Sequence, residues 1–250
     1  YYKMAADLGH PLAMFNLALM LSQGDGIPTD KKEAIKYYKM AIEKGQKNAM
    51  HNYALMLYNG DGMTVNKEEA AKYFKMAADK GYVISMYNYA SMVYNGDGVK
   101  IDKKEVAKYF KMAADRGHII SMYNYAVMLS NGEGVPMNKK EAARYYKMAI
   151  NKGDSNSMIN YGNLLIKGEG VHVDKKEAAR LYKLAADRGE ENGIFNYGLA
   201  LYDGLGVPSD RKEAARYFKL AADKGSKIGM HNYGVMLFNG DGVPVDKKEG

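Results

Sequence analysis

The chain lacks several features that would place it outside the cell or in a membrane. It contains no cysteine, which excludes disulfides and thiolate metal sites. It also contains no Asn-x-Ser/Thr sequon for glycosylation. No apolar run approaches the ~18 residues that a membrane-spanning helix needs. We therefore expect an intracellular, cytoplasmic protein.

What the chain does contain is one repeat of 36 residues. Its clearest mark is a Gly-x-Gly turn, as in Gly60-Asp61-Gly62. Self-similarity at such a period is typical of solenoids, whose core lies between neighbouring repeats. The sequence therefore predicts a single array over residues 1–250. The first glycine of the turn recurs without insertion or deletion at Gly24, Gly60, Gly96, Gly132, Gly168, Gly204 and Gly240.

An apolar segment, which we name helix A, precedes each Gly-x-Gly turn. In its first copy, apolar residues recur at the i, i+3, i+4, i+7 spacing of one helical face. They are Met14, Leu17, Ala18 and Leu21. The turn glycine ends the helix, because glycine adopts the left-handed cap conformation at little cost. We expect helix A at about 11–22, 47–58, 83–94, 119–130, 155–166, 191–202 and 227–238.

A second segment, which we name helix B, follows each turn. It opens on Asp30-Lys31-Lys32-Glu33 and its copies. The Asp or Asn can accept from free amides of the first turn, and the Glu can reach back to the cap residue. Each copy ends before a glycine such as Gly45, which is typical of a helix C-terminus. We expect helix B at about 31–44, 67–80, 103–116, 139–152, 175–188 and 211–224.

The unit is thus helix A, glycine turn, helix B, glycine turn. The apolar faces of one pair are too large to hide alone, so pairs must stack. The sequence predicts six complete pairs, with half a helix B before them and an incomplete repeat after them. Because the array starts inside a helix and stops at a helix start, we expect it to be a piece of a longer protein.

These motifs resemble those of the Sel-one-like repeat family, relatives of the tetratricopeptide repeat. The resemblance rests on a Gly-x-Gly-Val turn, an Asp-headed helix start and an aromatic pair before Ala-Ala-x-x-Gly, as at 96–99, 102–105 and 109–117. The family often has Trp first in the aromatic pair, where this chain has Tyr or, once, Leu181. The resemblance implies an all-α, right-handed α-solenoid. It also implies a non-catalytic adaptor that binds proteins on a concave face lined by helix A.

Catalytic and cofactor sites find little support in the sequence. None of the five histidines shares a helix at i, i+4 spacing with a second metal ligand, so we expect them to be solvated or to line a groove. The Gly-x-Gly turns lack the ligands of a calcium loop and the Lys-Ser/Thr of a phosphate loop. Lysines such as Lys32, Lys36 and Lys39 form a basic stripe on helix B, which we interpret as a solvated face. We expect no cofactor and neither nucleic acid nor membrane as a partner.

The best functional candidate is a column of asparagines on helix A. It lies nearly opposite the apolar face, and asparagine in mid-helix is not chosen for helix propensity. An amide offers donors and an acceptor that suit an extended peptide backbone. The alternative is that each amide bonds a neighbouring repeat and stiffens the stack. The asparagine column consists of Asn16, Asn52, Asn88, Asn124, Asn160, Asn196 and Asn232.

Side chains beside the asparagine column vary from copy to copy, as a groove that reads a bound chain requires. Aromatic residues on its flank can either line the groove or pack between repeats. The candidate groove residues besides the column are Tyr58, Tyr87, Tyr94, Tyr123, Asn95 and Asn131.

The sequence thus predicts a scaffold that binds a protein or an extended peptide segment in a helix A groove. A different class of function stays open, namely a structural spacer whose repeats associate end to end. An electropositive docking surface is the third possibility. A scaffold would lose its partner on helix A mutation, a spacer would have no groove ligand, and a docking surface would be steeply salt-dependent.

Overall fold

The computed structural model describes residues 1–248, and this part contains fourteen helices and no strand. None of these helices combines the length and the apolar character needed to cross a membrane. The helices are α1 (Tyr2–Asp7), α2 (Pro11–Gln23), α3 (Lys31–Glu43), α4 (Lys47–Asn59), α5 (Lys67–Asp79), α6 (Val83–Asn95), α7 (Lys103–Ala114), α8 (Ile119–Asn131), α9 (Lys139–Ile150), α10 (Ser155–Lys167), α11 (Lys175–Asp187), α12 (Glu191–Asp203), α13 (Arg211–Asp223) and α14 (Lys227–Asn239).

The helices fall into two compact units. The first comprises Tyr1–Ser121 with Glu133–Val135, and the second comprises Met122–Gly132 with the residues from Pro136 onwards. In both units, even-numbered helices are copies of helix A and odd-numbered helices are copies of helix B. The observed bounds agree with the expected ones to within two residues. The predicted all-α fold of helix-turn-helix repeats is therefore confirmed.

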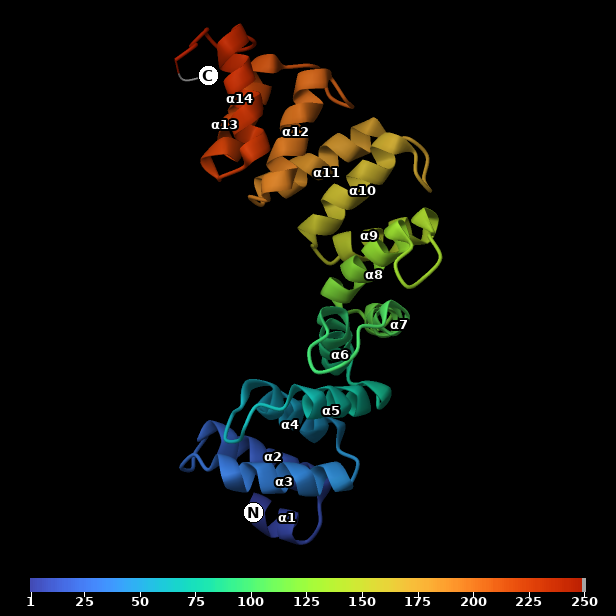
Figure 1. Ribbon diagram of the computed structural model, residues 1–250, viewed down its shortest axis with the longest axis vertical. Helices are drawn as coiled ribbons and strands as arrows, with labels where there is room; N and C mark the ends of the chain where they lie inside the picture. Colours follow the sequence, from blue (N-terminus) through green and yellow to red (C-terminus); the bar gives the residue numbers. More distant parts are fainter. Residues whose placement is uncertain (249–250) are drawn as a thin grey trace. The chain divides into compact units, whose positions relative to one another are not determined.

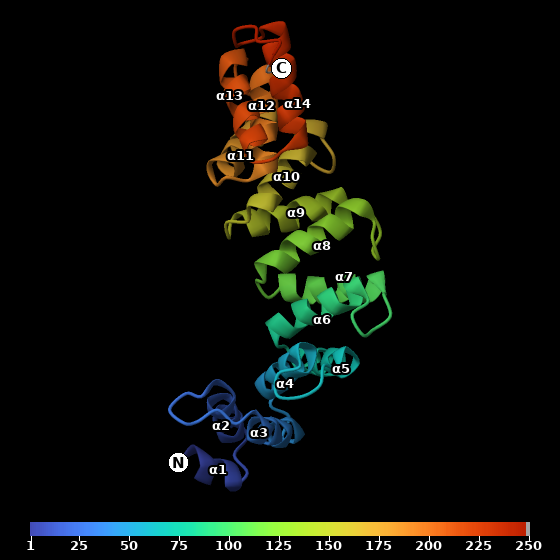
Figure 2. The same ribbon diagram turned by 60° about the vertical axis from the view of Figure 1, so that its left-hand side comes forward.

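Each helix A packs along the helix B that follows it. Figure 1 shows this for α4 with α5 in the first unit and for α10 with α11 in the second, and Figure 2 shows it for α12 with α13. Alanines with no exposed surface, such as Ala34 and Ala41 in α3, let the helices approach closely. Where α4 packs on α5, the ring of Tyr53 meets the ring of Tyr73 edge to face, with ring centroids 4.9 Å apart.

The first glycine of each turn ends helix A in the left-handed conformation, as predicted. Its φ lies between 69° and 74° in all seven copies. At the end of α4, Gly60 and Asp61 both donate their N–H groups to the carbonyl of Met56. These bonds satisfy the carbonyl that the helix end would otherwise leave free.

The cap of helix B differs in one respect from the predicted capping box. The Asp30 carboxylate does accept from the N–H of Glu33, at 3.0 Å. The glutamate does not return the bond, because the N–H of Asp30 donates to the carbonyl of Leu21 in α2 instead, at 2.9 Å. The same bond to helix A recurs in copies such as Asn66 to Leu57, at 2.8 Å. The cap residue thus also ties the two helices of a repeat together.

The second glycine of the turn has a role that the sequence did not predict. A Cβ at Gly98 would lie 2.6 Å from the carbonyl carbon of Lys67 and 2.6 Å from the nitrogen of Glu68. Those atoms belong to the first turn of α5, the helix B of the preceding repeat. This glycine therefore allows the turn of one repeat to touch the backbone of the repeat before it.

A ladder of ion pairs runs along the same junctions. In each rung, the first residue of helix B reaches the acid between the two glycines of the next turn, 30 residues later. Lys67 pairs with Asp97 at 2.7 Å and Lys139 with Glu169 at 2.6 Å. The charged groups remain partly exposed, so each rung contributes a small, salt-dependent amount of stability and joins neighbouring repeats. The rungs are Lys31–Asp61, Lys67–Asp97, Lys103–Glu133, Lys139–Glu169 and Arg211–Asp241.

Candidate partner-binding surface

The asparagine column is half-buried in every copy rather than fully exposed. The preceding helix B covers part of it, as the contacts of Asn52 show. Its carboxamide nitrogen donates to the hydroxyl of Tyr38 in α3, at 3.2 Å. Asn160 donates to Tyr146 in the same way, at 3.4 Å. In these two copies the amide joins neighbouring repeats, which is the structural role weighed above.

Other copies of the column are not engaged in this way. Asn232 donates to the carbonyl of Ile228 in its own helix, at 2.8 Å. Asn88 and Asn124 make no side-chain hydrogen bond within the described residues. Both donors and the acceptor of each of these two amides are therefore unengaged within the described residues. The column therefore divides into structural and unengaged copies.

The second aromatic residue of the preceding helix B distinguishes these copies. At Tyr38 and Tyr146 the hydroxyl accepts the amide, and where the residue is phenylalanine, as at Phe74, there is no acceptor. Tyr182 is an exception, because its hydroxyl donates to Asn163 and makes no bond with Asn196 within the described residues. The last-turn residue of helix A changes together with it, from serine to tyrosine. The first combination is Ser22–Tyr38–Asn52 and Ser130–Tyr146–Asn160, and the second is Tyr58–Phe74–Asn88, Tyr94–Phe110–Asn124 and Tyr202–Phe218–Asn232.

A hollow of about 240 Å³ lies beside Asn88 in the first unit. Its apolar side chains come from three helices, with Leu55 on α4, Phe74 on α5 and Met92 on α6. Polar side chains of α4 and α6 and of the following turn line the remainder. We name it the α4–α6 hollow, lined by Leu55, Tyr58, Asn59, Phe74, Asn88, Ser91, Met92, Asn95 and Asp97.

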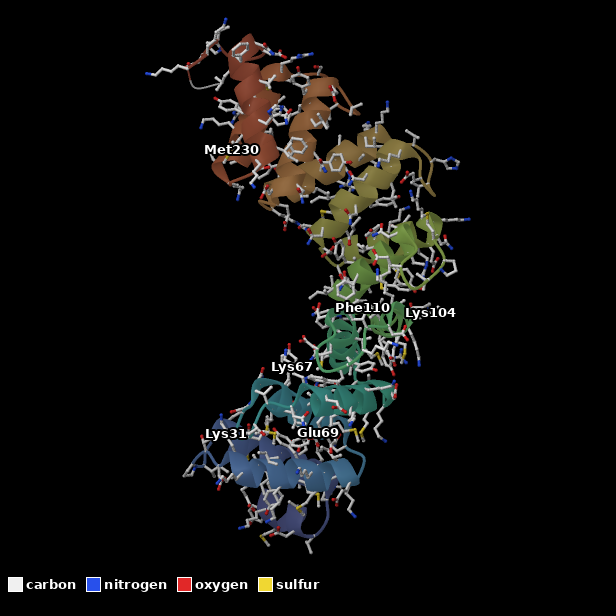
Figure 3. All side chains as sticks on the ribbon, in the orientation of Figure 1. Lys31, Lys67, Glu69, Lys104, Phe110 and Met230 are labelled. Atoms are coloured by element: carbon white, nitrogen blue, oxygen red, sulfur yellow. The ribbon has the colours of Figure 1, made fainter. Side chains whose placement is uncertain are left out.

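One rim of the α4–α6 hollow is held by a polar cluster. The Tyr58 hydroxyl donates to Asp97 Oδ2 at 3.3 Å, and Lys67 Nζ donates to Asp97 Oδ1 at 2.7 Å. Lys67, labelled in Figure 3, also lies 5.2 Å from the centre of the Tyr58 ring. Its hydrogen bond lowers the pKa of Asp97 below the ordinary value. Because the charges in this cluster are paired, the hollow suits a neutral side chain.

The other predicted groove residues fall into three groups: some line the hollow, some pack against aromatic rings, and some are exposed. Tyr58, Asn88 and Asn95 meet in the α4–α6 hollow. Tyr87 and Tyr123 are half-buried and pack against rings. The ring centroids of Tyr87 and His118 are 4.9 Å apart, and those of Tyr123 and Tyr146 are 6.3 Å apart. Tyr94 is 51% exposed, and Asn131 is exposed as well.

His51 departs from the expectation that the histidines are solvated or line a groove. It is only 6% exposed and packs against the rings of Phe74 and Tyr82, with distances between ring centroids of 5.5 and 4.7 Å. Its Nδ1 is 2.8 Å from Ser85 Oγ of α6. Burial lowers its pKa to about 4, so it is neutral at pH 7. The sequence contains a signal for this buried packing role, because several other repeats have Phe or Tyr at the position of His51.

Comparison with known proteins identifies the repeat. The family model described as "Sel1 repeat" matches residues 1–10, 11–46, 47–82, 83–118, 119–154, 155–190, 192–226 and 228–250. The chain belongs to the Sel1 repeat family. Proteins of this family mediate protein–protein interactions and are generally not catalytic. No group of metal-ligating side chains is found within residues 1–248.

The chain is similar to solved structures of this repeat fold. One is c5321, a protective antigen of uropathogenic Escherichia coli strains with this repeat fold; it is 27% identical with a TM-score of 0.88, and the match covers 99% of this chain and 53% of that one. The chain thus spans about half the length of that relative. Another is a Sel1 repeat protein from Oxalobacter formigenes, 24% identical with a TM-score of 0.76, covering 99% and 72%. No curated protein matches the sequence.

Proposed function

We propose that this Sel1 repeat chain is a scaffold that binds an extended segment of a partner protein across helix A, with the α4–α6 hollow as an anchor. The observation that carries the proposal is the half-buried Asn88, whose amide is unengaged beside that hollow. A side-chain amide can hold a peptide group of any sequence, since it both donates and accepts. The hollow adjoining it can then receive one side chain of the bound segment.

The lining of the hollow defines that side chain. Leu55, Phe74 and Met92 supply apolar contact, while Ser91 and Asn95 provide a polar edge. Asp97 is bonded by Lys67 and Tyr58, so the hollow offers no unpaired charge to a charged side chain of the partner. A leucine, methionine or phenylalanine side chain of the partner fits this chemistry. Burial of such a side chain contributes about 1.5–3 kcal/mol.

Site-specific photo-crosslinking tests the proposal. A benzophenone amino acid replaces Ser91 in the hollow, and a control variant carries it in place of Lys104, an exposed residue of α7 (Figure 3). We expect a protein from the cell of origin to crosslink from position 91 and not from position 104, and Asn88→Ala to weaken that crosslink several-fold. Identical products from both positions, or none from position 91, would contradict the proposal.

End-to-end association is the second candidate function, and the exposed face of α14 favours it. Met230 on this helix, labelled in Figure 3, is 51% exposed, whereas its copies Met86 and Met122 are buried. In a solenoid, such a residue is buried against the neighbouring repeat. Sedimentation at increasing concentration tests it: Met230→Lys should abolish association, and a wild-type chain that stays monomeric throughout rules it out.

A further inference from the structure

One rung of the ion-pair ladder is missing in the second unit. At the position of Asp61, Asp97, Glu133, Glu169 and Asp241, the turn before α13 carries Leu205. The lysine that would pair with it, Lys175 at the start of α11, is exposed and makes no hydrogen bond or ion pair among the described residues. Five rungs therefore have a carboxylate, and this one has a cation without one.

The backbone at this junction is nevertheless arranged as at the complete rungs. A Cβ at Gly206 would lie 2.0 Å from the carbonyl oxygen of Lys175. A Cβ at Gly134 would lie 2.0 Å from the carbonyl oxygen of Lys103, whose rung with Glu133 is formed at 3.0 Å. The turn thus approaches α11 as closely as in a complete rung, and only the acidic side chain is missing.

The last turns of α10 carry donors and no acid, whereas Asp203 of α12 stands two residues before Leu205. Ile166 stands where other rungs have Tyr58 or Tyr94, so this position supplies no ring to the lysine. The Asn163 carbonyl accepts from the Tyr182 hydroxyl at 2.7 Å, which leaves the Asn163 amide nitrogen for another partner. Lys167 lies one turn after Asn163 on the same helical face and replaces the Gln or Asn of earlier copies.

We propose that this position binds a carboxylate of the partner, so that an Asp or Glu side chain of the bound segment completes the rung at Lys175. The proposal rests on the proposed function, because it names the chemistry that a bound segment needs at an anchor within the second unit. Charge complementarity selects the occupant, because Lys175 is an exposed cation without a carboxylate partner among the described residues.

The first test places the carboxylate in the chain itself. Leu205→Asp should pair with Lys175 and raise the midpoint of thermal unfolding relative to Leu205→Asn, which has the same shape without the charge. Adding Lys175→Gln should cancel the difference between the Asp and Asn variants, and 1 M salt should reduce it. Equal midpoints for the Asp and Asn variants, or a difference that persists when Lys175→Gln is added, would overturn the proposal.

The second test offers the carboxylate in trans. A fluorescent hexa-aspartate peptide is titrated into the whole chain at low salt, with hexa-asparagine as the uncharged control. Lys175→Gln and Leu205→Asp should each weaken hexa-aspartate binding about fivefold or more, which is about 1 kcal/mol. Lys176→Gln, which removes the same charge from the adjacent outer-face residue, and Leu205→Asn should change it less than twofold. Equal losses from Lys175→Gln and Lys176→Gln would leave only general electrostatics and would overturn the proposal.

These tests do not depend on the α4–α6 hollow, which lies in the other unit. Loss of crosslinking at position 91 with a positive result at Lys175 would mean that acidic segments bind without that anchor. The converse result would leave the scaffold function intact and remove its acidic specificity.

Discussion

The carboxamide of Asn52 donates a hydrogen bond to the hydroxyl of Tyr38 across 3.2 Å. One repeat later, Phe74 occupies the position of that tyrosine and Asn88 has no such acceptor. One sequence column therefore contains residues that hold the repeats together and residues whose polar groups remain available. The residue 14 positions earlier distinguishes Asn52 from Asn88, and the two residues make different predictions.

Asn52→Ala should lower the free energy of unfolding by about 1 kcal/mol, because it leaves the hydroxyl of the buried Tyr38 without its amide partner. Asn88→Ala should leave stability unchanged or raise it slightly, since alanine is the better helix former and no bond is lost. Chemical denaturation of the two variants beside the wild type measures both effects. Equal losses in the two variants would show that Asn88 is structural as well.

The turn glycines separate backbone strain from contact between repeats. Gly98 and Gly81 both have positive φ, 70° and 84°, but a Cβ at Gly81 meets no atom within 4 Å. Gly81→Ala should therefore cost about 1 kcal/mol from the conformation alone. Gly98→Ala should cost clearly more, because its Cβ also clashes with the backbone of α5. A thermal melt of Gly98→Ala that matches that of Gly81→Ala would contradict the close contact.

His51 should make the protein less stable in mild acid. Its pKa falls from 6.5 to about 4 on folding, so below pH 6.5 the unfolded chain binds a proton that the folded chain does not. Stability is complete above about pH 6.5 and declines towards pH 4, by up to about 3 kcal/mol from this residue. His51→Phe, which matches the residue type of Phe15 and Phe195 at this position, should flatten the unfolding free energy between these pH values. An unchanged pH profile would show that His51 does not titrate in this way.

The elements of the fold could be predicted because each depends on local chemistry. Helix ends follow from the glycines and cap residues, and φ values such as 72° at Gly60 follow from the turn. The contacts between repeats could not be predicted from one repeat read alone. The rung of Lys67 and Asp97 and the approach of Gly98 to α5 join residues about 30 positions apart. Only complementary charges in two columns, read across copies, would have indicated them.

For the candidate surface, the sequence identified the asparagine column but could not assign its roles. The choice between ligand binding and packing depends on a hydroxyl in another helix, as the pair Tyr38 and Asn52 shows. The 36-residue period gives Asn52 and Asn88 the same position on helix A, although only Asn52 makes a side-chain hydrogen bond to the preceding helix B. The coupled change from Ser22 and Tyr38 to Tyr58 and Phe74 was visible in the sequence, and its meaning required the structure.

That coupled change allows the hollow beside Asn88 to be switched without a new fold. The double variant Tyr58→Ser, Phe74→Tyr gives this repeat the combination found at Ser22 and Tyr38. The new hydroxyl should accept from the Asn88 amide, as Tyr38 does from Asn52. The variant should remain helical by circular dichroism, although it gives up the bond from Tyr58 to Asp97.

Partner capture by the benzophenone group at position 91 should fall at least fivefold in this double variant, because one engaged amide removes about 1 kcal/mol of hydrogen bonding. The control is Ser22→Tyr, Tyr38→Phe, which makes the opposite change at the first repeat and leaves the α4–α6 hollow untouched. It should free the amide of Asn52 and keep capture at position 91. If the double variant folds and still captures the partner fully, the Asn88 amide is not the group that holds the bound segment.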